Sequence, residues 1–155
     1  EKPMAINSEE AKKMLDAEML MFKFKDMQHY YVLLFDDDKI DAIDLERRIR
    51  AFNDANYLDK KLSATSTLFT MTKQILSVKR FRSKDEAMDY YNNINTVLKD
   101  FNQDQYIHFV ISIQNYPTFY KNKNIETYEK FFKLMYLTPI LESNTANETK
   151  NEEKQ

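Results

Sequence analysis

Glycine is absent from the 155-residue chain, and its absence excludes several kinds of catalytic and nucleotide-binding site. Phosphate-binding loops of the P-loop and dinucleotide kinds need glycine where the backbone approaches the phosphate or adopts a positive φ. The nucleophile elbow of hydrolases has the same requirement. We therefore expect no nucleotide cofactor and no hydrolase chemistry of that kind, with turns formed by Asn, Asp, Pro and Ser.

Cysteine is absent as well, which excludes disulfides, zinc–thiolate sites and cysteine nucleophiles but does not distinguish one redox compartment from another. The net charge is −2, so the chain lacks the basic surface that nucleic-acid binding requires. No apolar run approaches the roughly 20 residues of a membrane span, and we expect no direct membrane insertion. Because the chain begins with Glu1, we expect it to be a piece of a longer protein whose targeting signal lies upstream.

Hydrophobic periodicity predicts four strands and two long helices in the order βαββαβ. Two right-handed crossovers in that order close most simply into a four-stranded antiparallel sheet with both helices on one face, the ferredoxin-like sandwich. The expected fold class is therefore α+β. The predicted strands are His29–Phe35, Leu62–Phe69, Gln74–Phe81 and Tyr106–Ile113, and the predicted helices are Asp41–Tyr57 and Lys84–Phe101, with Asp41 and Ser83 as their expected N-caps.

Further helices are expected to flank this sandwich. A leading helix begins near Ser8, and a C-terminal helix over Ile125–Leu137 carries an aromatic stripe that must be buried, with a core role favoured over an interface. The alternation between Leu20 and Phe24 fits either a strand or the ragged end of the leading helix. The expected division is a leading helix and linker over 1–28, a ferredoxin-like domain with the C-terminal helix over 29–137, and a disordered tail over 138–155.

An acidic run precedes the first crossover helix and invites comparison with a calcium-binding loop. Counted from Asp36, such a loop would need Gly at its sixth position and Glu at its twelfth, where this chain has Asp41 and Arg47. The run is instead typical of a solvated loop before a helix N-terminus. We expect no metal site here.

The two histidines also give no sign of a shared site. His29 and His108 each lie near the start of a predicted strand, and these two strands are antiparallel neighbours in the expected sheet, so we expect the imidazoles toward opposite ends of the sheet. An RNA-recognition domain shares the βαββαβ order, but its glycine-and-aromatic signature is missing from the third predicted strand. The sequence therefore predicts no enzyme, no metal, no cofactor and no nucleic-acid partner.

Five segments of the chain together add to this interpretation. They are HYYVLLF (His29–Phe35), FN (Phe52–Asn53), SVKRFRSKDEAMDYYNNI (Ser77–Ile94), FVIS (Phe109–Ser112) and NYPTFYKNKNIETYEKFF (Asn115–Phe132). Through these segments, over about residues 29 to 136, the chain resembles the C-terminal domain of SprE/PorW-type tetratricopeptide lipoproteins, which belong to the type IX secretion and gliding-motility machinery of Bacteroidetes. That resemblance implies a non-enzymatic accessory module that contacts a protein partner in the cell envelope, periplasmic and associated with the outer membrane through a missing upstream region.

A glycan-binding module is the alternative, because peptidoglycan-binding SPOR domains share the βαββαβ order and bind glycan strands on the open face of the sheet. If Ile107, Phe109 and Ile111 face the helices, the opposite face would be available to a partner or to peptidoglycan. The residues expected on that open face are Thr65, Thr67, Ser77, Lys79, His108 and Ser112.

Overall fold

The computed structural model describes residues 4–141, and this part of the chain divides into two compact units. The larger unit is Lys25–Lys123, and the smaller one combines the segments before and after it. This grouping differs from the expected division, which placed the C-terminal helix with the sheet and kept the leading helix and linker over 1–28 separate from it. Most of the predicted tail, 142–155, lies outside the described residues.

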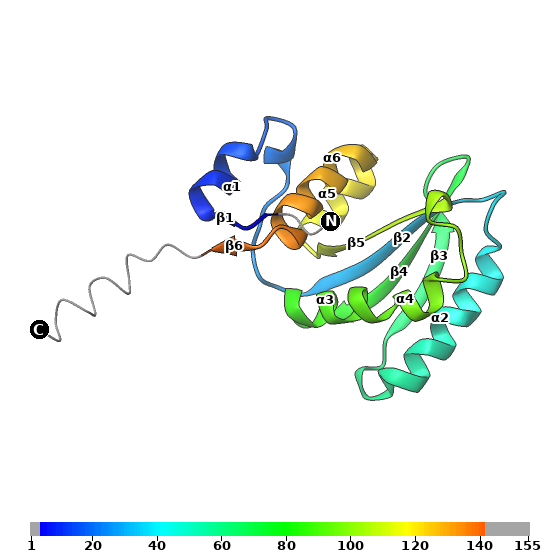
Figure 1. Cartoon of the computed structure of the whole chain (residues 1–155). Coiled ribbons are helices and arrows are strands. Elements are labelled where there is room, and N and C mark those ends of the chain that lie inside the picture. The colour runs from blue at the N-terminus through cyan, green and yellow to red at the C-terminus, as the bar shows by residue number, and fades with distance from the viewer. Residues whose placement is uncertain (1–3, 142–155) are drawn as a thin grey trace, which may run out of the picture. The chain divides into compact units, whose positions relative to one another are not determined.

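The larger unit is an α+β fold built on a four-stranded antiparallel sheet, as predicted from the periodicity (Figure 1). The strand order is β3-β4-β2-β5, so the two central strands, β2 and β4, are the first and third of this sheet in chain order. Its elements are β2 (His29–Asp36), α2 (Ala42–Asn56), η2 (Leu58–Lys60), β3 (Ser63–Leu68), β4 (Lys73–Phe81), α3 (Lys84–Asn93), α4 (Asn95–Leu98), η3 (Gln103–Gln105), β5 (Tyr106–Ser112) and α5 (Asn115–Asn122).

The two crossover helices begin at the caps that the sequence predicts. Asp41 accepts from the backbone N–H of Ile43 at 3.0 Å, and the Ser83 hydroxyl accepts from Glu86 N–H at 3.2 Å. Each bond satisfies one of the amides that a helix start leaves without a partner. The predicted second helix, Lys84–Phe101, is divided near Ile94 into α3 and α4.

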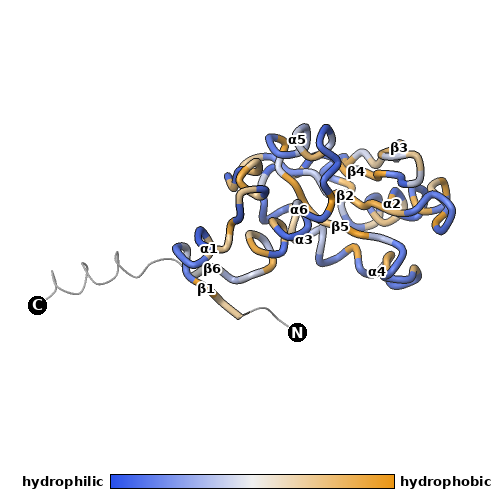
Figure 2. Tube along the Cα trace, turned by 90° about the horizontal axis from the view of Figure 1, so that it is seen from above, coloured by the Kyte–Doolittle hydropathy of each residue, from blue (hydrophilic) through white to orange (hydrophobic). Residues whose placement is uncertain are grey.

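The helices α2 and α3 cover one face of the sheet. Tyr31 of β2 packs edge-on against Tyr90 of α3 at 5.1 Å between ring centroids, and Leu45 and Ile49 of α2 are buried. The Tyr90 hydroxyl donates to Asn53 Oδ1 at 2.6 Å, which gives a buried polar group on α2 a partner. Hydrophobic stretches along β2, β4 and β5 supply the sheet's share of the core (Figure 2).

The opposite face of the sheet is covered over its centre by α5. Phe119 of this helix stacks on Phe69 and meets Phe109 of β5 edge-on, with both pairs of ring centroids 5.3 Å apart. The expectation that Phe109 and its neighbours face α2 and α3 is therefore wrong. Because α5 supplies a second apolar layer, the apolar set of β5 packs against it, and the alternate set faces α2 and α3.

The smaller unit has an aromatic core of its own. Phe22 meets Tyr128 edge-on at 4.9 Å between ring centroids and lies 5.6 Å from Phe131. The predicted stripe Tyr128, Phe131, Phe132, Met135 and Tyr136 is buried apart from a partly exposed Met135, so its core role is confirmed. The elements of this unit are β1 (Ile6–Asn7), α1 (Ser8–Met14), η1 (Met19–Met21), α6 (Ile125–Phe132), the π-helix η4 (Lys133–Leu137) and β6 (Ile140–Leu141).

Several details of the smaller unit differ from the sequence-based expectations. Asn7, not Ser8, caps the leading helix, because its side chain accepts from Glu10 N–H at 2.8 Å. The segment after the helix forms the 3-10 turn η1, and no strand. Residues Ile140–Leu141 of the predicted tail form β6, which pairs in parallel with β1.

Candidate functional site

The six residues predicted for an open face divide between the two faces of the sheet. Directly opposed residues of neighbouring strands share a face, and Thr65 is opposite Ser77 while Ser63 is opposite Lys79. Thr65, Thr67, Ser77 and Lys79 therefore lie on the face away from α2 and α3, as expected. The prediction is wrong for His108 and Ser112, which lie on the face that α2 and α3 cover.

On the face away from α2 and α3, α5 covers two of the four remaining residues. The ammonium of Lys79 lies 4.8 Å from the ring centroid of Tyr30 and 5.6 Å from that of Tyr116 on α5. The hydroxyls of Ser77 and Tyr116 are 3.4 Å apart, and Ser77 is buried. Only the β3 residues Thr65 and Thr67 keep exposed side chains, so the free part of this face is a strip along the edge strand.

His108 is an interior residue rather than a contact residue. Its ring stacks on Tyr91 at 4.3 Å between centroids, and its Nδ1 lies 2.9 Å from the Tyr31 hydroxyl. Burial lowers the pKa of His108 to about 4, so the imidazole is neutral at physiological pH and shares a hydrogen bond with the Tyr31 hydroxyl. Ser112 is 1% exposed and its hydroxyl accepts from Asn115 N–H at 3.1 Å, which anchors the start of α5.

The second histidine, His29, begins β2 and is opposite Ser112, whereas His108 is opposite Leu33 in the middle of that strand. It is fully buried, and its Nδ1–H donates to the carbonyl of Met27 at 2.7 Å. Burial lowers the pKa of His29 as well. Within residues 4–141 no three His, Cys, Asp or Glu side chains gather in a way that could hold a metal ion.

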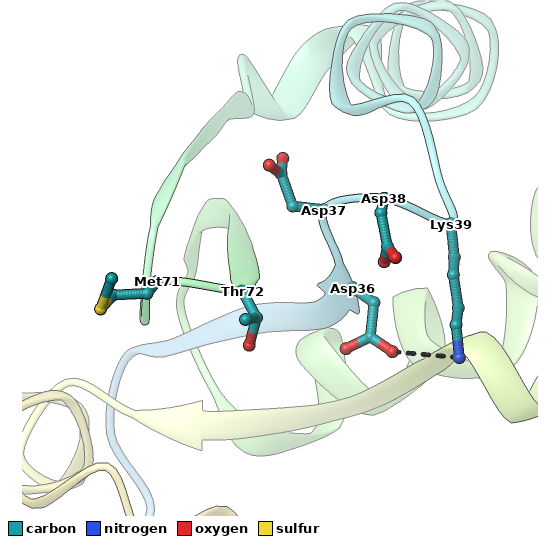
Figure 3. Close-up of a pocket in the computed structure, with 6 residues that line it drawn as sticks. All are labelled: Asp36, Asp37, Asp38, Lys39, Met71 and Thr72. Carbon is teal, nitrogen blue, oxygen red and sulfur yellow. Dashed lines mark ion pairs between the residues drawn. The ribbon is translucent and has the colours of Figure 1, made fainter.

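The acidic loop after β2 lines an open pocket of about 480 Å³ together with Lys39, Met71 and Thr72 (Figure 3). Asp36 binds the ammonium of Lys73 at 2.7 Å, and this hydrogen bond lowers the pKa of its carboxyl group. Asp37 accepts from the side-chain amide of Gln74 at 3.0 Å and points away from the other two carboxylates. Two of the three loop carboxylates, those of Asp36 and Asp37, are therefore paired with neighbouring side chains of β4.

Three large apolar side chains near the end of β3 and the start of α2 are exposed, a feature that the sequence-based interpretation missed. Ile43 is 82% exposed, Leu68 is 60% exposed and Met71 is 97% exposed. Glu46 of α2 is hydrogen-bonded to Ser66 of β3. Ile43 lies about one helical turn before Glu46, and Leu68 lies two residues after Ser66, so Ile43 and Leu68 belong to the same end of these two elements. The sequence signal was available, since Ile43 lies outside the apolar stripe of its helix and Met71 lies in a hairpin turn.

Comparison with protein-family models, curated proteins and solved structures finds no match to this chain. Across residues 4–141 no helix combines the length and the apolar character needed to cross a bilayer. The resemblance to the SprE/PorW-type domain stays a prediction.

Proposed function

We propose that the larger unit is a ferredoxin-like protein-interaction module that performs no chemistry. The strand order β3-β4-β2-β5 with two crossover helices on one face is the arrangement expected of a split βαβ fold, which supports this assignment. From the resemblance we infer that the module belongs to an envelope-associated lipoprotein of the type IX secretion or gliding type, periplasmic and held at the outer membrane by an upstream region. Since a fold alone does not define a function, support for a binding role has to come from the surface of the unit.

The observation that carries the proposal is the exposed apolar group at the end of β3, formed by Ile43, Leu68 and Met71. We call these three residues the β3-end patch. Large apolar side chains left this exposed cost solubility unless a partner covers them, and a rim of charge beside an apolar centre is typical of transient interfaces. Asp37 and Asp38 supply that rim. The partner that fits is a protein surface with an apolar centre and basic residues around it.

Glycan binding remains the second candidate, favoured by one observation. The exposed hydroxyls of Thr65 and Thr67 lie on the same face of the sheet as Lys79, next to the tyrosines of that face. Hydroxyl and aromatic groups on one surface suit a polysaccharide chain. Against it, α5 covers the centre of this face through Tyr116 and Phe119. The available strip is therefore narrow.

One experiment with two arms separates these candidates. The full chain is immobilised and offered envelope proteins of a type IX-secreting bacterium in one arm and purified peptidoglycan in the other. The variant Ile43→Ser/Leu68→Ser/Met71→Ser is expected to lose protein capture, while the control Leu58→Ser, which changes a side chain that is 72% exposed elsewhere, keeps it. Equal capture by both variants would contradict the protein-binding proposal, and peptidoglycan binding that Thr65→Ala/Thr67→Ala removes would favour the alternative.

A further inference from the structure

The outer edge of β3 is an unpaired strand edge within the sheet. β3 pairs only with β4, so the backbone groups of alternate β3 residues point away from the sheet. The hydrogen bonds of Ala64 O and Ser66 N identify these residues, because both atoms are bonded to side chains of α2 and not to β4. Leu68, two residues further along, follows the same alternation. Ala64, Ser66 and Leu68 therefore present the outward edge.

Two residues of α2 occupy this edge. Glu46 Oε2 accepts from Ser66 N–H at 3.2 Å and from the Ser66 hydroxyl at 2.7 Å. Arg50 donates to the carbonyl of Ala64 from Nε at 3.2 Å and from Nη2 at 2.9 Å. The two side chains also pair with each other at 2.7 Å. We call this arrangement the Glu46–Arg50 clip, because it supplies the donor and the acceptor that a neighbouring strand would supply.

The strand that the clip covers has none of the usual defences of an edge strand. Its sequence, SATSTL over Ser63–Leu68, contains no charge and no proline, and four of its six residues are Thr or the apolar Ala and Leu. Edge strands usually avoid pairing with another chain by carrying lysine, proline or a bulge. Here the protection comes from another element, α2, through the clip.

We propose that the outer edge of β3 is a strand-pairing surface for β3 of a second copy of this chain, and that the Glu46–Arg50 clip keeps it closed. The strand is self-complementary when it runs antiparallel to itself about Ser66. In that register Ser66 is opposite Ser66 and Ala64 is opposite Leu68, so the outward groups of both copies meet in hydrogen-bonded pairs. Thr65 is then opposite Thr67 on the other face, a favourable cross-strand combination.

This proposal uses backbone groups, whereas the proposed function uses the side chains of the β3-end patch. If the chain fails to capture a protein partner, the proposed function is contradicted but the strand-pairing proposal is not. The variant Glu46→Ala/Arg50→Ala opens the edge without changing the net charge. Glu129→Ala/Lys133→Ala is a matched control, because that pair has the same i,i+4 spacing, a similar distance of 2.9 Å and similar exposure, and lies on α6 and η4 in the other unit.

Sedimentation equilibrium of the full chains provides the test. We expect the wild type and the control to be monomeric and the clip variant to dimerise with a dissociation constant lower by at least about tenfold. Ser66→Pro added to the clip variant should restore the monomer, because the Ser66 N–H points away from β4 and proline is tolerated at such an edge position.

Three results would overturn the proposal: a clip variant as monomeric as the control, a dimer that Ser66→Pro does not dissociate, or a wild type already dimeric to the same degree. Circular dichroism checks that each variant is folded. If the double variant unfolds, Arg50→Ala alone frees the carbonyl of Ala64 and gives the same readout.

Discussion

The two edge strands of the sheet, β3 and β5, occupy equivalent positions and have opposite characters. In β5 the residues Phe109 to Ser112 are all buried, since one face meets α5 and the other meets the α2–α3 layer. In β3 only Ala64 is buried, and four of its six side chains are exposed. An edge strand can thus belong to the core on both faces or remain at the surface with its backbone closed by a neighbouring helix. We infer that β5 stabilises the fold, while β3 is the strand available for contact.

The largest expected difference between the strands is in stability. Phe109→Ala in β5 removes a fully buried ring that meets Phe119, so it should lower the free energy of unfolding by about 3–5 kcal/mol. Thr67→Ala in β3 changes an exposed side chain and should alter the free energy by less than about 0.5 kcal/mol. Chemical denaturation of the two variants measures both values. Similar losses of unfolding free energy in the two variants would contradict the difference between β5 and β3.

The next effect is a pH dependence that originates in β5. The pKa of His108 is about 4 in the folded chain and about 6.5 in an unfolded one, so the unfolded state binds more protons between these values. Stability contributed by the neutral imidazole is complete above pH 6.5 and is lost as the pH falls toward 4, by up to about 3 kcal/mol. His108→Gln should therefore lose less stability than the wild type between pH 7 and pH 4.5.

Thermal unfolding across that pH range gives the measurement. Because burial lowers the pKa of His29 as well, part of the slope should persist in His108→Gln. A variant with the full wild-type slope would show that His108 is not held neutral by its contacts with Tyr91 and Tyr31.

Much of the larger unit could be predicted from the sequence because its local signals agree with its packing. The four strands and the caps at Asp41 and Ser83 are confirmed. The apolar run His29–Phe35 has both faces covered, as its composition indicates. The strand order also follows from the connectivity alone. Here propensity, periodicity and capping point to one answer.

The sequence did not indicate which set of β5 side chains packs against α2 and α3, because it did not reveal that α5 covers the opposite face of the sheet. Alternation in β5 defines two sets of residues but not which set meets which layer. The sequence-based interpretation assumed one apolar layer, formed by α2 and α3, whereas Phe119 and Tyr116 bring a second. His108 and Ser112 were misplaced for that reason. Turns were expected to rest on Asn, Asp, Pro and Ser, yet among the described residues the left-handed backbone falls on Lys61 and Lys123.

The surface along β3 to which we assign binding could be predicted only in part. Thr65 and Thr67 were placed on the correct face because alternation along β3 follows its pairing with β4. The Glu46–Arg50 clip was not visible in the sequence, since it joins residues of α2 and β3 that are 14 and 20 positions apart. Such a contact depends on how the helix crosses the sheet.

The most direct test of the contrast between the two edges is amide hydrogen exchange resolved by residue. In the wild type the Ser66 amide should be protected by Glu46, although it has no strand partner. Glu46→Ala should speed its exchange by about tenfold or more, as expected for the loss of one hydrogen bond to a charged group. Glu46→Gln keeps an acceptor and should retain most of the protection, and the amides that join β5 to β2 should be unchanged in both variants. A Ser66 amide that exchanges at the same rate in the wild type and in Glu46→Ala would contradict the account.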